Sequence, residues 1–155
     1  MKGKTKVIQI LNDLLAGELT AIDQYFIHSR MYEDMGLTKL YERLDHERVE
    51  ETDHADQMIK RILFLEGKPD VSKRDPLNVG TTVPQMLKHD MALEYAVINN
   101  LKAAIAVCET EQDFETRAML GKQLEDSEED HAYWLEKQLG LIDKIGLPNY
   151  LQSQL

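Results

Sequence analysis

Two Glu-x-x-His units are the residues of this sequence whose types and spacing could do chemistry. Glu51 precedes His54 by three residues, and Glu128 precedes His131 by the same step. Residues three apart lie on one face of an α-helix, so each unit can direct a carboxylate and an imidazole to a common point. A single unit of this kind is weak evidence, because solvated helices contain many by chance.

Each unit also has a single acid upstream. Glu18 lies 33 residues before Glu51, and Glu94 lies 34 residues before Glu128. Each single acid and each Glu-x-x-His unit interrupts a series of apolar residues spaced for the core face of a helix, one interruption in each of four predicted helices. A buried carboxylate without a partner is costly, so four such interruptions require a compensating charge. The sequence therefore carries one three-residue ligand pattern twice.

Together these groups match the ligand set of di-iron and di-manganese carboxylate helical bundles. Oxygen donors with two imidazoles suit iron or manganese, although zinc would also bind. Two divalent cations would neutralise the four carboxylates inside the bundle, and a bridging oxide or hydroxide would offset the charge added by oxidation. The predicted metal-ligating and catalytic residues are Glu18, Glu51, His54, Glu94, Glu128 and His131.

A different interpretation has these groups in buried ion pairs or facing solvent on irregular helices. For Glu47, near the edge of its apolar series, that interpretation and metal binding are equally favoured. Tyr25 and Trp134 lie close to the predicted site along their helices. Two roles are open for them: aromatic residues that support the site or donate electrons to it, or ordinary core residues. Cys108 is expected to be a small buried hydrophobe.

The elements that must position these residues are long helices. Four prolines at positions 69, 76, 84 and 148 leave two long segments free to be helical. Breaks at Gly36 and Asp113 divide these segments, with Thr38 and Asp113 as helix N-caps and Thr82 with Gln85 as a capping box. The pattern predicts helices over about 5–34, 38–66, 83–110 and 114–145, and a short helix near Pro148. The fold class is therefore all-α, a four-helix bundle with a long crossover and a short fifth helix.

Length and composition limit the remaining possibilities. A chain of 155 residues predicts a single domain over 1–155. The formal net charge of −10 argues against a nucleic-acid partner and suits metal cations. One cysteine permits no intrachain disulfide, and neither a signal peptide nor an uninterrupted apolar run of membrane-spanning length is present. We expect a cytoplasmic protein without a membrane partner.

The sequence resembles the bacterioferritins over essentially its whole length. The stretches that carry the resemblance are LLAGELTAIDQYFIHSRMYEDMG, HAD, RILFLEGKP, EEDHAYWLEKQLGLI and NYLQSQL. The resemblance implies a hollow homo-oligomer of 24 subunits that oxidises Fe(II) with O2 or H2O2 at an intrasubunit di-iron centre and stores ferric mineral. It also implies a ferredoxin-type reductant for iron release. Its ferroxidase ligands fall on the six residues selected above.

The chain departs from the family's usual pattern at Thr52. Typical bacterioferritins have a methionine there that ligates haem, and a hydroxyl is a poor substitute for a thioether. Haem b is therefore not expected, and the chain resembles the type of subunit called a bacterial ferritin, either in its own shell or mixed with a haem-binding partner. His46 and Glu50, four residues apart, could form an iron site on the inner surface.

Two other functions fit the same pattern. One is a peroxide-scavenging di-iron protein, although such proteins usually add a cysteine-rich iron domain that one cysteine cannot supply. The other is a non-catalytic or haem-related subunit of a mixed shell. Anaerobic Fe(II) binding followed by oxidation distinguishes these functions from a ferroxidase.

Overall fold

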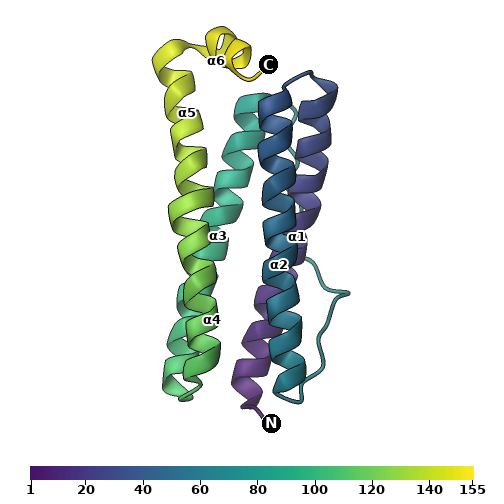
Figure 1. Cartoon of the computed structure of the whole chain (residues 1–155), viewed down its shortest axis with the longest axis vertical. Coiled ribbons are helices and arrows are strands. Elements are labelled where there is room, and N and C mark those ends of the chain that lie inside the picture. The colour runs from purple at the N-terminus through teal and green to yellow at the C-terminus, as the bar shows by residue number, and fades with distance from the viewer.

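The computed structural model describes residues 1–155 and contains helices only. Two long helices form a first hairpin, and a third pairs with a fourth long rod built from three helical segments (Figure 1). The elements are α1 (Thr5–Asp34), α2 (Thr38–Phe64), α3 (Val83–Thr110), α4 (Phe114–Glu125), η1 (Asp126–Ala132), α5 (Tyr133–Ile145) and α6 (Leu147–Ser153). The last helix lies across one end of the bundle, and the N-terminus lies at the other. The predicted four-helix bundle with a short fifth helix is confirmed.

Local signals account for most helix ends. Gly36 takes a left-handed φ of +77° after α1, as a helix C-terminus requires. Asp113 accepts a hydrogen bond from the Thr116 backbone N–H at 3.0 Å and caps α4. Two details differ from prediction: Thr38 is the first residue of α2 rather than its N-cap, and α2 ends at Phe64 because Glu66 adopts φ +63°.

The fourth rod differs from the single α-helix predicted for residues 114–145. Residues 126–132 form a π-helix, in which backbone hydrogen bonds join residue i to i+5. Such a turn holds more residues than the 3.6 of an α-helix, so side chains within it point in different directions from those that α-helical spacing predicts. This matters for the second Glu-x-x-His unit, which lies entirely within this segment.

The core consists of two apolar clusters at different heights in the bundle. One contains Val7, Leu11, Met58, Ile62, Leu101, Cys108 and Leu120, among others. The other contains Tyr25, Tyr32, Leu40, Leu44, Leu87, Leu135 and Tyr150, among others. On each long helix, the predicted polar interruption falls between the residues of the two clusters. The apolar packing therefore brackets one polar layer from above and below.

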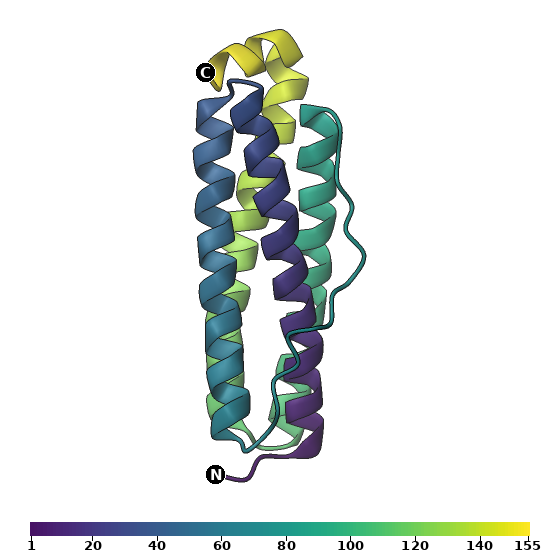
Figure 2. The same ribbon diagram turned by 90° about the vertical axis from the view of Figure 1, so that its right-hand side faces the viewer.

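The crossover between α2 and α3 runs along the outside of the bundle for much of its length (Figure 2). Its backbone N–H groups donate to polar side chains of α1, which replaces the hydrogen bonds that a loop would otherwise make with water. The donors and acceptors are Asp70 to Asn12, Asp75 to Thr20, Asn78 to Gln24 and Gly80 to His28. The crossover is thus held against the outer side of α1, and it does not enter the polar layer between the helices.

Gly80→Ala is expected to destabilise the protein by about 1–3 kcal/mol, the cost of overpacking a close contact. A β-carbon at Gly80 would lie 2.6 Å from the Met86 backbone nitrogen, which cannot move away as a flexible side chain can. Urea unfolding measures the loss. Gly121→Ala is the matched control: the β-carbon there meets nothing within 4 Å, so a helical alanine should leave stability unchanged or raise it by about 0.5–1 kcal/mol.

Helix α3 is long and apolar enough to cross a membrane, judged by length and composition only. Core helices of soluble proteins meet the same criterion. In this bundle α3 contributes apolar side chains to both clusters, and it buries Asp90 and Glu94 completely. We therefore interpret α3 as a core helix.

Candidate metal centre

The structure brings five of the six predicted ligands together in the polar layer. They come from α1, α2, α3 and η1, and each is at most 3% exposed: Glu18, Glu51, His54, Glu94 and His131. Their ligand atoms fall into two groups, Glu18 with Glu51 and His54, and Glu51 with Glu94 and His131. Within each group the atoms lie within 4.8 Å of one another. Glu51 belongs to both groups.

Glu51 lies between the two imidazoles. Its Oε2 is 3.2 Å from His54 Nδ1, and its Oε1 is 2.9 Å from His131 Nδ1. The two rings are nearly parallel, with centroids 6.3 Å apart. One carboxylate can therefore contact two metal ions, each held by one histidine.

The single acids complete the two halves. Glu18 Oε2 lies 3.9 Å from His54 Nδ1, and Glu94 Oε1 lies 3.3 Å from His131 Nδ1. The Tyr25 hydroxyl donates to the same Glu94 oxygen. Each half of the site thus has one single acid, one histidine and a share of Glu51. The internal repeat predicts the first half, whereas in the second half Glu51 takes the place predicted for Glu128.

Burial and mutual charge shift the protonation of these groups. Burial, aided by the nearby Glu51 charge, raises the pKa of Glu94 to about 7 and holds the pKa of Glu18 well above its usual value. For His54, burial would lower the pKa, but the hydrogen bond to Glu51 and its charge outweigh burial and raise the pKa to about 9. The pKa of His131 is raised for the same reason, with Glu47, Glu51 and Glu94 as its partners. Protons on the histidines therefore supply the positive charge that the carboxylates need.

Three oxygens show that these protons do not satisfy the whole site. Glu18 Oε2, Glu51 Oε1 and Glu94 Oε2 are buried and accept no hydrogen bond. A carboxylate oxygen in that situation loses its hydration without compensation. A cation bound among the carboxylates would supply the missing partner, so the residues fit a metal centre.

Glu128 is the predicted ligand that the structure places elsewhere. Its side chain is 40% exposed, and its Oε1 lies 2.9 Å from Lys102 Nζ. The prediction assumed an α-helix, in which Glu128 and His131 share a face. In the wider turn of η1 they do not, so His131 points inward while Glu128 points toward α3. Ligation by Glu128 stays a prediction.

Two acids at the site were not singled out by the sequence. Asp126 Oδ2 lies 3.0 Å from His54 Nε2, and Asp130 pairs with Arg43 at 2.7 Å. Both belong to the acid-rich run that forms η1, where five of seven residues can ionise. Helical periodicity cannot identify them, because the π-turn changes which residues face inward.

The structure also shows the burial and contacts of the other residues that the sequence singled out. Cys108 is buried in the apolar core, as expected. Glu47 is also buried and lies in an ion pair with His131. His46 Nε2 lies 2.9 Å from Glu50 Oε1, so that predicted pair is in contact. Thr52 is exposed, and its hydroxyl donates to the Arg48 carbonyl.

Comparison with known proteins identifies similar chains. A family model described as a ferritin-like domain matches residues 8–145. A bacterial ferritin of Synechocystis is 65% identical over 155 residues, covering 100% of this chain and 99% of its own. A bacterial ferritin of Pseudomonas aeruginosa is 59% identical over 155 residues and 100% of both chains. A bacterioferritin of Mycobacterium avium is 41% identical over 150 residues, 97% of this chain and 94% of its own.

Proposed function

The chain belongs to the ferritin family, and on that premise we propose that it stores and detoxifies iron by oxidising Fe(II) to Fe(III). The observation that carries this proposal is the position of Glu51 between two histidines, with one further buried acid on either side. We propose that residues 1–155 act as one domain. The ferric product is stored inside the shell of 24 subunits that the resemblance to bacterioferritins implies.

The buried residues prepare the site to hold two Fe(II) ions as substrate. Glu18 and His54 would hold one ion, Glu94 and His131 the other, and Glu51 both. An iron pair can deliver two electrons together to O2 or H2O2. Because histidine binds metal only through an unprotonated nitrogen, His54 and His131 must release the Nδ1 protons that now face Glu51. Iron binding is therefore coupled to proton release.

Anaerobic Fe(II) titration followed by exposure to air tests this function. We expect two Fe(II) bound per chain and a rapid rise of ferric absorbance when oxygen is admitted. The proposal fails if the wild-type protein binds no iron pair or shows no rapid phase. A non-catalytic shell subunit would give that second result.

Glu128→Ala separates the role of Glu128 in metal binding from its role in the fold. The exposed pair with Lys102 contributes at most about 1 kcal/mol, so the metal-free variant should unfold near the wild-type urea midpoint. If Glu128 moves inward to complete the ligand set, the variant should lose the rapid ferric phase. An unchanged rapid phase would show that five ligands are sufficient. Glu129→Ala, the neighbouring exposed acid, serves as the control.

Assembly, haem and location are further parts of the proposal. Apolar side chains exposed on α1 and α2 suit contact with other subunits: Phe26, Val49, Leu63 and Phe64. Thr52 does not fit a haem ligand, since it has no thioether and its hydroxyl is engaged by Arg48. We propose a cytoplasmic shell, alone or mixed with a haem-binding subunit, from which a ferredoxin-type reductant releases iron.

A further inference from the structure

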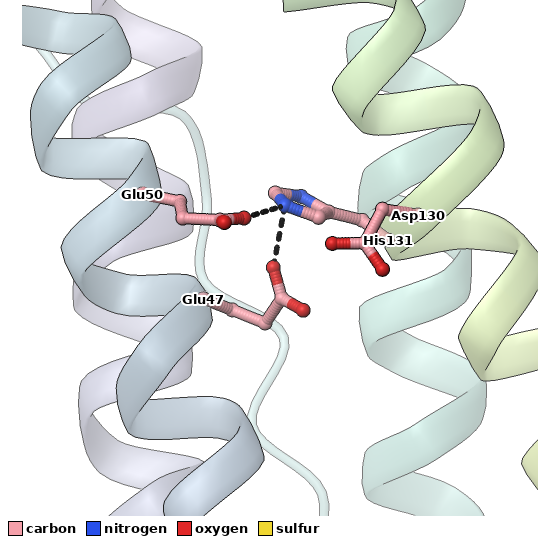
Figure 3. Close-up of side chains that lie close together, drawn as sticks. All are labelled: Glu47, Glu50, Asp130 and His131. Atoms are coloured by element: carbon pink, nitrogen blue, oxygen red, sulfur yellow. Dashed lines mark hydrogen bonds and ion pairs between the residues drawn. The ribbon is translucent and has the colours of Figure 1, made fainter.

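His131 lies between two groups of carboxylates and faces one group with each ring nitrogen. Its Nδ1 faces Glu51 and Glu94, in the candidate metal centre. Its Nε2 lies 2.5 Å from Glu47 and 2.6 Å from Glu50, on the opposite side of the ring (Figure 3). The ring is 1% exposed, so water does not compete for either nitrogen. The groups at Nε2 therefore determine what Nδ1 can do.

Glu47 is the fixed member of the pair at Nε2. Arg43 Nε lies 2.5 Å from Glu47 Oε1, and Arg43 Nη2 lies 2.7 Å from Asp130 Oδ1. The same guanidinium lies over the ring of Trp134, 4.9 Å from its centroid. The Glu47 side chain is 5% exposed, whereas that of Glu50 is 34% exposed. The Glu47 carboxylate is thus held in place and shielded from water.

The group formed by Glu47, Glu50, Asp130 and His131 could itself suggest a separate cation site, because its ligand atoms lie within 4.8 Å of one another. Two facts favour another role. Arg43 already supplies a positive charge between two of the acids. In addition, a neutral imidazole has one lone pair, so His131 cannot bind metal through Nδ1 unless Nε2 keeps its proton.

We propose that Glu47, anchored by Arg43, is a positioning residue that holds the proton on His131 Nε2 and so directs the Nδ1 lone pair to metal. A carboxylate that accepts the second N–H of a ligating histidine fixes both its tautomer and its ring orientation. This inference rests on the proposed function, since it assumes that His131 binds metal. Glu50 Oε2, more exposed, makes the hydrogen bond with Nε2, and the buried Glu47 carboxylate lies 2.5 Å from the same nitrogen as an ion pair.

Anaerobic titration of the assembled protein with Co(II), followed by visible absorbance, tests the role of Glu47. The wild type should bind two Co(II) per chain. Glu47→Ala should weaken one of the two by about 10–100-fold, the usual effect of losing such a partner, and leave the other unchanged. Glu47→Gln keeps an oxygen acceptor of the same size and should recover most of the affinity. Glu42→Ala, an exposed acid on α2, is the control and should change neither.

The outcomes separate this inference from the proposed function. If the wild type binds two Co(II) and Glu47→Ala binds both with unchanged affinity, the positioning role is wrong. The role is equally wrong if Glu47→Ala weakens both sites alike, which indicates a general structural effect, or if Glu50→Ala alone causes the selective loss. A wild type that binds no Co(II) pair overturns the proposed function, and the inference with it.

Discussion

Glu51→Ala is expected to abolish binding of the metal pair and to slow the rapid ferric phase by at least about 100-fold, since loss of a supporting side chain alone costs a metal site up to that amount. Glu51 is the one carboxylate that contacts both His54 and His131. Its removal therefore takes a ligand from each half of the site at once, whereas Glu18→Ala or Glu94→Ala takes a ligand from one half.

Anaerobic Fe(II) titration measures the number of ions bound, and stopped-flow absorbance after mixing with oxygen measures the rate. Asp53→Ala is the matched control, because Asp53 is an exposed acid on the same helix and pairs only with Gln57. It should retain two Fe(II) per chain and the wild-type rate. Retention of both properties in Glu51→Ala would contradict the assignment of Glu51 as the shared ligand.

The metal-free protein is expected to lose stability as the pH rises from 6.5 to 9. The pKa of His54 is about 9 in the folded protein, against about 6.5 when unfolded. The folded state thus binds this proton more tightly, and the resulting stability is fully present below pH 6.5 and lost by about pH 9. It amounts to about 3 kcal/mol at 1.36 kcal/mol for each factor of ten in proton affinity. Glu94 acts in the same direction at lower pH, because its raised pKa means that folding opposes its ionisation between about 4.5 and 7.

Urea unfolding in the presence of a chelator measures this dependence across the pH range. His54→Gln removes the titrating group and should flatten the change between pH 6.5 and 9. Saturation with Co(II) should reverse its sign, because metal binding requires deprotonated histidines and strengthens as the pH rises. A chelated wild type whose stability is constant or increases over this range would contradict the charge balance described for the site.

The apolar spacing and the single acids were sufficient to predict the bundle and most of its site. Val7, Leu11 and Tyr25 are buried on the same series as Glu18. This agreement has a physical basis: long straight helices keep a constant period, so each residue's position along the sequence determines its direction. The same regularity brings Glu94 to the height of Glu18 in the bundle.

The direction of Glu128 could not be predicted in the same way. The run DSEEDH carries no apolar residue that would reveal a change of period, so the sequence there is equally compatible with an α-turn and a π-turn. The ion pair between Glu128 and Lys102 connects residues on different helices, and no local pattern specifies it. The role of Glu47 was undecided because Glu47 lies near the edge of its apolar series, and that pattern does not specify its ion pair with Arg43.

The π-segment also affects how chains of this kind should be aligned. A π-turn accommodates one more residue than the α-turn it replaces, so η1 is equivalent to a single-residue insertion within a continuous helix. A one-residue gap between Asp126 and Ala132 in a pairwise alignment would consequently indicate that an α-turn replaces the π-turn within a continuous helix, without a loop. Deleting one residue there should convert the π-turn into an α-turn, which keeps α4 and α5 in phase but changes the directions of the side chains between them. Length differences in this stretch therefore report the orientation of His131.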